Sequence, residues 1–197
     1  MSDEQVPAPP KRTAEGWLPG DPDPRRYVER VLRVNQAGEF GAVRIYDGQL
    51  AALRWTGRSM TPTARKIEAM ARQEREHRAV FDKLLVQRRV RPTLLSPVWS
   101  IAGFVLGAGT ALLGDRAAMA CTVAIEETID EHYAGQKEKL GDDEAALRET
   151  VGRFRADELA HRDEALASGA EQAPGYGLMS AAIKAGSRLA IWLSTRI

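Results

Sequence analysis

Two of the chain's three histidines stand three residues after a glutamate, and this repeated pattern constrains the fold more than any other feature of the sequence. The pairs are Glu74 with His77 and Glu158 with His161. Residues three apart share one face of an α-helix, so each pair can converge on a single point. Apolar residues at helical spacing around Glu74 turn that face toward a core. A buried carboxylate needs a cation, a pairing partner or a shifted pKa, and a metal ion would supply the first.

The helix before each pair offers one more inward-facing glutamate. Glu39 lies on the apolar stripe of its helix with Leu32. Glu126 lies on a similar stripe with Val123, whereas its neighbour Glu127 is about 100° further round the helix. The chain therefore repeats one half-site, a glutamate followed on the next helix by a Glu-x-x-His pair.

Together, the two half-sites predict the ligand set of ferritin-like di-iron bundles. Four carboxylates would balance the charge of two Fe(II) or Mn(II) ions, which makes such a cluster tolerable in a dry interior. We expect two Fe ions per chain, with Glu74 and Glu158 bridging them. The predicted metal ligands are Glu39, Glu74, His77, Glu126, Glu158 and His161. The alternative is that both pairs belong to charged networks on exposed helix faces.

Helix start and stop signals recur along the chain, and no alternating run typical of strands stands out. We expect helices over residues 25–55, 62–90, 97–114, 115–140, 143–167 and 178–195. The signals that set these limits are Thr61-Pro62, Ser96-Pro97, Asp115 as a cap, Gly141 as a C′ residue and Asp142 as the next cap. The predicted fold is all-α, a ferritin-like four-helix bundle with an apolar crossover helix and a C-terminal amphipathic helix.

Length and composition narrow the class of protein. A chain of 197 residues suits one domain, which we place at 25–197 behind a Pro-rich and charged lead-in at 1–24 that resembles neither a secretion signal nor a transit peptide. The single cysteine, Cys121, excludes an internal disulfide framework and suits a buried thiol in a reducing compartment. A net charge of +1 offers no electrostatic footprint for nucleic acid.

Two apolar segments raise the question of a membrane. Residues 92–114 carry no charge and are long enough to cross a bilayer, but glycines and small polar residues favour a crossover that lies on the bundle or on a membrane surface. The last helix carries Ile183 and Trp192 beside Lys184 and Arg188. It could join a membrane-facing layer or simply pack on the core.

At the residues that carry these patterns, the sequence resembles the demethoxyubiquinone hydroxylase family, the di-iron monooxygenases of ubiquinone biosynthesis. The resemblance extends from about residue 31 to residue 197. It rests on RVNQAGEFGAVRIYDGQL, QEREHRAVFDKLL, RVRPTLLSPVWSIAGFVLGAGTALLG, AMACTVAIEETIDEHYAGQ, FRADELAHRDEAL and AGSRLAIWLSTR. The family's ligands match the same six residues. Its residues proposed for electron relay match His132 and Tyr133, for which core or surface packing is the alternative, as it is for Tyr46.

The resemblance also implies a reaction and its partners. The substrate would be 2-polyprenyl-3-methyl-6-methoxy-benzoquinone, hydroxylated with O2 and with NADH as the proposed electron donor. The location would be the cytoplasmic side of a bacterial inner membrane, as a peripheral protein on the membrane surface. A lipid-binding helper protein and a second copy of the chain in a homo-oligomer are possible further partners. The rival functions are a ferritin-like iron-storage protein, a tRNA-hydroxylating di-iron enzyme and a non-catalytic quinone- or lipid-binding protein.

Overall fold

The computed structural model describes residues 23–197, so almost all of the predicted lead-in lies outside the described residues. Within them the regular structure is helical, which confirms the all-α prediction. The helices are α1 (Pro24–Trp55), α2 (Pro62–Arg88), α3 (Ser96–Leu112), α4 (Asp115–Lys139), α5 (Ala145–Ala167) and α6 (Tyr176–Ser194), with short 3-10 turns at Asp142–Glu144 and Ala170–Gln172. Each limit lies within two residues of the predicted one.

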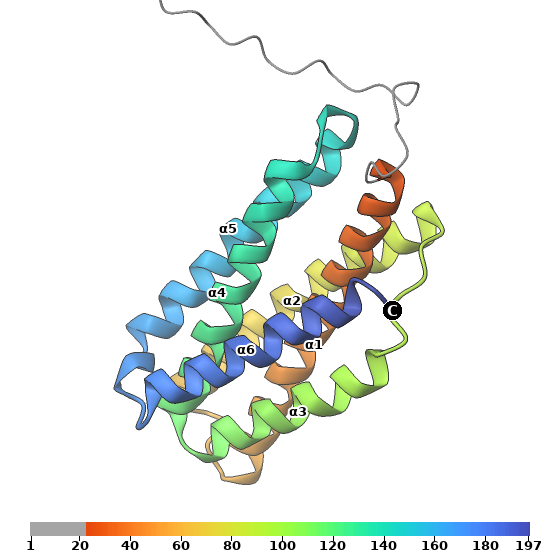
Figure 1. Cartoon of the computed structure of the whole chain (residues 1–197). Helices are drawn as coiled ribbons and strands as arrows, with labels where there is room; N and C mark the ends of the chain where they lie inside the picture. The colour runs from red at the N-terminus through yellow and green to blue at the C-terminus, as the bar shows by residue number, and fades with distance from the viewer. Residues whose placement is uncertain (1–22) are drawn as a thin grey trace, which may run out of the picture.

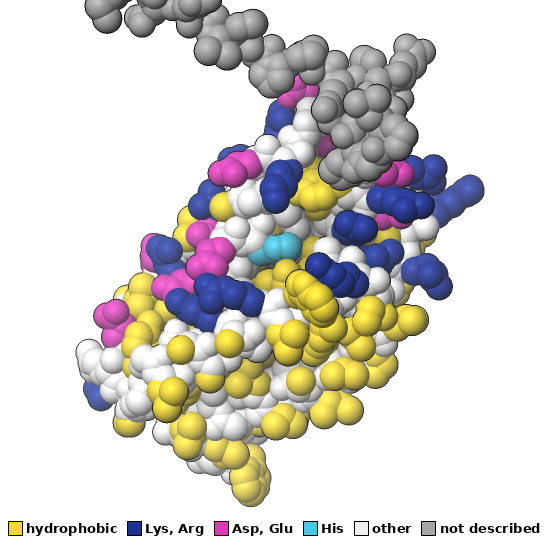
Figure 2. Space-filling model, viewed as in Figure 1, with side chains coloured by type: hydrophobic (Ala, Val, Ile, Leu, Met, Phe, Trp, Pro, Cys, Tyr) yellow, Lys and Arg dark blue, Asp and Glu magenta, His cyan; other side chains and the backbone are white. Residues whose placement is uncertain are grey.

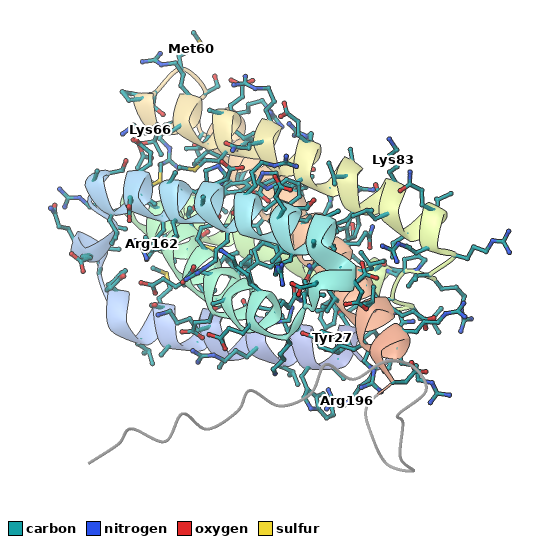
Figure 3. The ribbon with its side chains drawn as sticks, turned by 90° about the horizontal axis from the view of Figure 1, so that it is seen from above. Tyr27, Met60, Lys66, Lys83, Arg162 and Arg196 are labelled. Atoms are coloured by element: carbon teal, nitrogen blue, oxygen red, sulfur yellow. The ribbon has the colours of Figure 1, made fainter. Side chains whose placement is uncertain are left out.

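The six helices form a four-helix bundle with a further layer on one side. Helices α1 and α2 pack as one antiparallel hairpin and α4 and α5 as a second. Helix α3 lies along α1, and α6 lies along α4 (Figure 1). Seen from above, α2 and α5 lie on one side of the molecule and α6 on the other (Figure 3). The predicted crossover and C-terminal helices therefore cover α1 and α4, whose other faces meet α2 and α5.

One predicted helix cap is confirmed and another is wrong. Thr61 is the N-cap of α2, because its Oγ1 accepts a hydrogen bond from the backbone N–H of Ala64 at 3.1 Å. Ser96 is not the cap of α3 but its first residue, and its hydroxyl donates to the carbonyl oxygen of Thr93 at 2.9 Å. That bond closes the preceding turn, so the serine side chain does not cap an amide of α3.

The predicted caps around α4 also need correction. Gly114 occupies the N-cap position with φ 125°, a conformation that favours glycine. Asp115 is the first residue of the helix and accepts a hydrogen bond from Arg58 at 2.7 Å. Gly141 follows the C-cap as predicted but has φ −74°, so it does not make a left-handed cap. Asp142 begins a 3-10 turn instead of capping α5 directly.

Two apolar cores fill the ends of the bundle, and the middle is left to polar residues. The first core includes Tyr46, Leu53, Ile67, Met119 and Ala165. The second includes Leu32, Phe81, Tyr133, Val151 and Phe154. Each of the four bundle helices contributes to both cores. The segments between these contributions form the waist of the bundle, where the predicted ligands lie.

Close contact between α1 and α3 depends on glycine. A Cβ added to Gly107 would lie 1.9 Å from the carbonyl oxygen of Ile45, and one added to Gly48 would lie 2.1 Å from that of Phe104. Both distances are far below van der Waals contact, so any side chain at these positions would push the two helices apart. Gly107 in the apolar segment and Gly48 on α1 therefore serve helix packing.

The outer face of α3 and α6 remains apolar. Side chains that are more than two-fifths exposed there include Val98, Ile101, Val105, Leu113, Leu189 and Trp192. Figure 2 shows apolar side chains gathered over this part of the surface. In the part of the chain that the structure describes, no helix is both long enough and apolar enough to cross a bilayer. Cys121 is buried and free, as predicted.

Candidate metal centre

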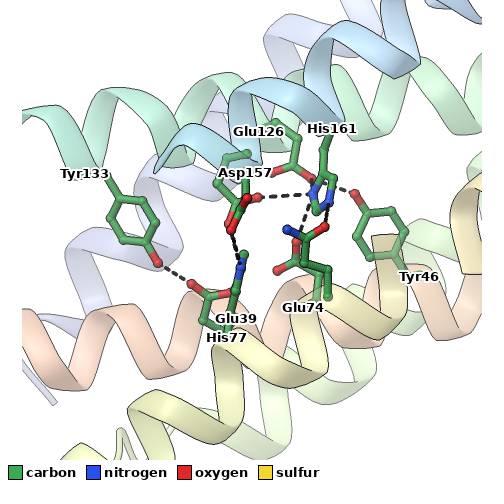
Figure 4. A network of polar contacts seen from close by, with 10 residues as sticks. Glu39, Tyr46, Glu74, His77, Glu126, Tyr133, Asp157 and His161 are labelled. Carbon is green, nitrogen blue, oxygen red and sulfur yellow. Dashed lines mark hydrogen bonds and ion pairs between the residues drawn. The ribbon is translucent and has the colours of Figure 1, made fainter. Parts of the chain in front are cut away.

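All six predicted ligands come together at the waist of the bundle. Helices α1 and α4 each supply one glutamate, while α2 and α5 each supply a Glu-x-x-His pair. The ligand side chains labelled in Figure 4 point toward one another from different helices. The exposed fractions are at most 5% for Glu39, Glu74, His77, Glu126, Glu158 and His161. Glu127, which helical phase predicts to face away from the cluster, forms an ion pair with Lys184.

The six side chains form two overlapping groups of four possible ligands. Within each group, one ligand atom from every residue lies within 4.8 Å of the others. The groups are Glu39, Glu74, His77 and Glu158, and Glu74, Glu126, Glu158 and His161. Because Glu74 and Glu158 belong to both groups, the geometry suits two metal ions that share two carboxylates. This sharing is the arrangement that the repeated half-site predicts.

The inward-facing atoms of these residues make no hydrogen bond, although Nδ1 of His77 lies 3.3 Å from Glu158 Oε1 and Nδ1 of His161 lies 3.1 Å from Glu74 Oε1. These atoms are Glu39 Oε2, both carboxylate oxygens of Glu74 and Glu158, Glu126 Oε2, and Nδ1 of His77 and His161. An unsatisfied buried polar atom costs about 1–3 kcal/mol, so this many in one place favours a bound cation. Carboxylate oxygens and imidazole nitrogens are suitable ligands for Fe(II) and Mn(II). The residues present therefore fit a pair of such ions.

Electrostatics leads to the same conclusion. Burial above all, and then repulsion from the neighbouring carboxylates, raises the pKa of Glu74 and Glu126 well above the ordinary range, and burial also raises the pKa of Glu158. Burial lowers the pKa of His77, but the adjacent Glu158 and Glu39 carboxylates outweigh it and raise that pKa to about 10. Divalent cations would compensate the negative charge of these buried carboxylates and so remove their mutual repulsion.

Two tyrosines bind the glutamates of the opposite half-site. Tyr46 on α1 donates from its hydroxyl to Glu126 Oε1 at 2.6 Å, and Tyr133 on α4 donates to Glu39 Oε1. Core packing alone therefore does not describe either tyrosine. Each bond uses one oxygen of a terminal glutamate and leaves the other, Oε2, facing the cluster. The tyrosines thus orient Glu39 and Glu126 as ligands with one free oxygen each.

The histidines have partners that sequence reasoning misses. His77 Nε2 lies 3.1 Å from Asp157 Oδ2, and His161 Nε2 lies 3.1 Å from Gln73 Oε1. Each partner stands immediately before the glutamate of the other Glu-x-x-His pair. The signal that could have revealed them is this shared position in the repeat. Since Nε2 is held on the outer side, Nδ1 of each ring is the nitrogen that faces the cluster.

Of the two predicted relay residues, only Tyr133 contacts the ligand cluster. His132 is partly exposed, and its ring centroid lies 6.4 Å from that of Tyr133. Its Nε2 is 2.6 Å from the amide nitrogen of Gln136, which is itself paired with the buried Asn35. Burial, with a smaller effect of Lys139, lowers the pKa of His132 to about 4, so the ring is neutral at pH 7.

An apolar cavity of about 540 Å³ lies close in the chain to the ligand segments of α1 and α4, although none of the six predicted ligands lines it. It lies between α1, α3, α4 and α6, and its lining includes Gly38, Gly41, Leu106, Ile125, Ile183 and Ala190. Gly38 and Ile125 are the chain neighbours of Glu39 and Glu126, so the cavity and the cluster share the same segments of α1 and α4. A Cβ added to Gly38 or Gly41 would meet no atom within 4 Å. The glycines therefore widen the cavity.

A bundle that buries four glutamates and two histidines in two overlapping ligand groups has the ferritin-like architecture, and its residues fit those of the di-metal carboxylate class. Residues 26–194 match the family model described as "Ubiquinone biosynthesis protein COQ7". The chain belongs to this family, as its resemblance to the demethoxyubiquinone hydroxylases predicts.

Relatives from bacteria and eukaryotes support the assignment. The chain is 57% identical to the 3-demethoxyubiquinol 3-hydroxylase of Rhodospirillum rubrum, over 95% of this chain and 86% of the relative. It is 47% identical to the human mitochondrial NADPH-dependent 3-demethoxyubiquinone 3-hydroxylase, over 88% and 79%. The mitochondrial 5-demethoxyubiquinone hydroxylase of Saccharomyces cerevisiae is 39% identical, over 87% and 78%. The chain is therefore an enzyme, an oxidoreductase of the hydroxylase type.

Proposed function

We propose that this enzyme hydroxylates the ring of 2-polyprenyl-3-methyl-6-methoxy-benzoquinone, a demethoxyubiquinone, at a centre of two iron ions. The observation that carries the proposal is the pair of ligand groups that share Glu74 and Glu158. The relatives support the substrate class, because their names describe demethoxyubiquinone or demethoxyubiquinol hydroxylases.

The chain's own residues would hold the metal and keep the site dry. Glu39 and His77 would bind one ion and Glu126 and His161 the other, with Glu74 and Glu158 between them. When bound, the two iron ions would supply the electrons that activate O2. Tyr46 and Tyr133 would keep the terminal glutamates in place, and burial of all six ligands would exclude water from the reacting groups.

The apolar cavity is the proposed site of the quinone. Its lining is made almost entirely of apolar and small side chains, which suits a ring that carries a polyprenyl tail. The wall nearest the ligands comes from α1 and α4, so a ring bound there would lie beside Glu39 and Glu126. The tail would leave between α3 and α6.

The same two helices are the proposed contact with a membrane surface. Their exposed apolar side chains would lie in the lipid interface and shorten the path of an insoluble substrate from the bilayer to the cavity. In a bacterial cell this would be the cytoplasmic face of the inner membrane. Sedimentation with lipid vesicles tests this part. Ile101→Ser with Val105→Ser should reduce vesicle binding and leave iron binding intact.

His132 and Tyr133 are the proposed route for electrons toward the centre. The hydrogen bond from Tyr133 to Glu39 supports a path that ends at the ligand cluster, and the partial exposure of His132 supports one that begins at the surface. The donor would be a reduced nicotinamide nucleotide. NADH is the expectation from sequence, whereas the human relative is named as NADPH-dependent, so both should be tried.

Anaerobic reconstitution tests the proposal. The metal-free protein is loaded with Fe(II), then given ¹⁸O2, a short-chain demethoxyquinone and NADH or NADPH. We expect two iron ions per chain and a product that carries one ¹⁸O atom. Glu74→Ala is the control that should lose both properties. Hundreds of iron ions per chain would favour storage, and bound isoprenoid lipid without O2 consumption would favour a non-catalytic lipid-binding protein.

A further inference from the structure

The outer contacts of the two histidines are reciprocal. Asp157 on α5 contacts His77 on α2, and Gln73 on α2 contacts His161 on α5. Both contacts measure 3.1 Å between the histidine Nε2 and a side-chain oxygen. Each helix of the α2/α5 pair thus supplies a metal-ligand pair and also supports the histidine of its partner helix.

The two contacts differ in charge, while the four glutamates of the cluster are closely matched. Asp157 offers a carboxylate and Gln73 a neutral amide. Both terminal glutamates accept a bond from a tyrosine, and both ligand groups share the same two bridging glutamates. The outer partner of the histidine is therefore one difference between the two halves, and the stacking of the His77 ring on Phe154, with centroids 3.9 Å apart, is another.

This difference has a direct effect on the ligand nitrogen. When Nδ1 binds a metal, the proton sits on Nε2, which donates to the outer partner. A carboxylate acceptor draws that proton more strongly than an amide does, so Nδ1 becomes a stronger electron donor to the metal. The additional negative charge beside His77 also attracts a cation. Both effects favour the same half of the cluster.

We propose that Asp157 and Gln73 are positioning residues that make the two metal positions unequal, so that the position of His77 binds a divalent ion more tightly than the position of His161. The inference rests on the metal centre of the proposed function. It assigns an order of loading that the ligand set alone does not contain, because the six ligands are the same in kind on both sides.

Variants that keep one histidine isolate each position. His161→Ala keeps the His77 position, and His77→Ala keeps the His161 position. Mn(II) is titrated anaerobically into each metal-free variant, and free Mn(II) is counted by electron paramagnetic resonance. We expect the His161→Ala protein to bind its ion about 10-fold more tightly, since changes in such outer partners alter metal affinity by about 10–100-fold.

Substitutions of the outer partners then test the cause. Asp157→Asn in the His161→Ala protein should weaken Mn(II) binding about 10-fold, and Gln73→Glu in the His77→Ala protein should strengthen it by a similar factor. Each substitution placed in the other background is the matched control and should change the affinity less than it does beside its own histidine. Asp157 is about one-third exposed, so the exchange should not disturb the fold.

Equal affinities of the two single-position variants would overturn the inference. It would also fail if the difference survived the combined exchange of Asp157→Asn and Gln73→Glu. If an alanine variant loses helical circular dichroism, His77→Gln and His161→Gln replace the alanine pair. Failure of the wild-type protein to bind Mn(II) would instead reject the metal centre itself, so the two failures are distinguishable.

Discussion

The ligand cluster and the apolar cavity lie on neighbouring faces of the same two helices, yet they are built in opposite ways. On α1, Glu39 faces the cluster, while Gly38 and Gly41 line the cavity. Consecutive helix positions point about 100° apart, so one turn can serve both sites. The cluster is dense with charge and hydrogen-bonding atoms. The cavity exists because side chains are small or missing.

The comparison shows that the two sites depend on different things. The cluster buries four glutamates whose carboxylates face one another, so we expect its stability to depend on a bound cation. The cavity has little polarity and depends on how closely α3 approaches α1. Changes in the cluster should therefore alter metal content and pH response. Changes in the cavity lining should alter substrate binding. Changes where α3 packs on α1 should alter the stability of the fold.

The largest expected effect comes from removing a shared glutamate. Glu158→Ala takes a carboxylate from both ligand groups, so we expect both ions to bind at least about 100-fold more weakly and turnover to be lost. Glu126→Ala takes one from a single group and should leave one ion bound. Metal analysis after dialysis gives the comparison. Two ions retained in the Glu158→Ala protein would show that the residue does not bridge.

The next effect separates glycines that pack helices from glycines that line the cavity. Gly107→Ala places a methyl group against the backbone of Ile45 and should destabilise the fold by about 1–3 kcal/mol. Gly41→Ala faces open space and should raise stability slightly, because alanine is the better helix former. Urea denaturation of the two variants measures the contrast. Equal losses would mean that the helices adjust freely.

A larger side chain at a glycine that lines the cavity should weaken substrate binding without changing metal binding or stability. Gly41→Leu would project into the cavity, and we expect KM for a long-chain demethoxyquinone to rise about tenfold, equivalent to about 1.4 kcal/mol of binding. Iron content and melting temperature should stay unchanged, and Gly41→Ala serves as the milder control. An unchanged KM would place the quinone elsewhere.

The smallest effect is a pH dependence found only in the metal-free protein. Burial raises the folded-state pKa of Glu74, Glu126 and Glu158, so the stabilisation from their protonated forms is full below the unfolded pKa near 4.5 and is lost as pH rises through the folded values. His77, with its pKa raised to about 10, acts in the same direction at higher pH.

The melting temperature of the metal-free protein should therefore fall between pH 5 and pH 8, by about 2–4 °C for each kcal/mol lost. The metal-loaded protein should not show this fall, because bound cations hold the carboxylates ionised. Scanning calorimetry across this range checks the difference, and Glu158→Gln should flatten the curve of the metal-free protein. A steeper fall in the loaded protein would contradict the assignment.

Much of the ligand set follows from sequence because helical phase is local. The inward direction of Glu126, and the outward direction of Glu127, need only the 100° step between neighbouring residues and the apolar residues nearby. The wrong prediction at Ser96 also has a local cause. Its hydroxyl can either cap α3 or donate to the carbonyl oxygen of Thr93, and the sequence does not show which of the two bonds forms.

The sequence by itself determined the all-α class, the repeated half-site and the six residues that face the waist of the bundle. Only the tertiary structure decided that Tyr46 binds Glu126 and Tyr133 binds Glu39, and that Asp157 and Gln73 support the histidines of opposite helices. These contacts join different helices. They depend on the rotation and the relative height of packed helices, which the periodicity of a single helix does not contain.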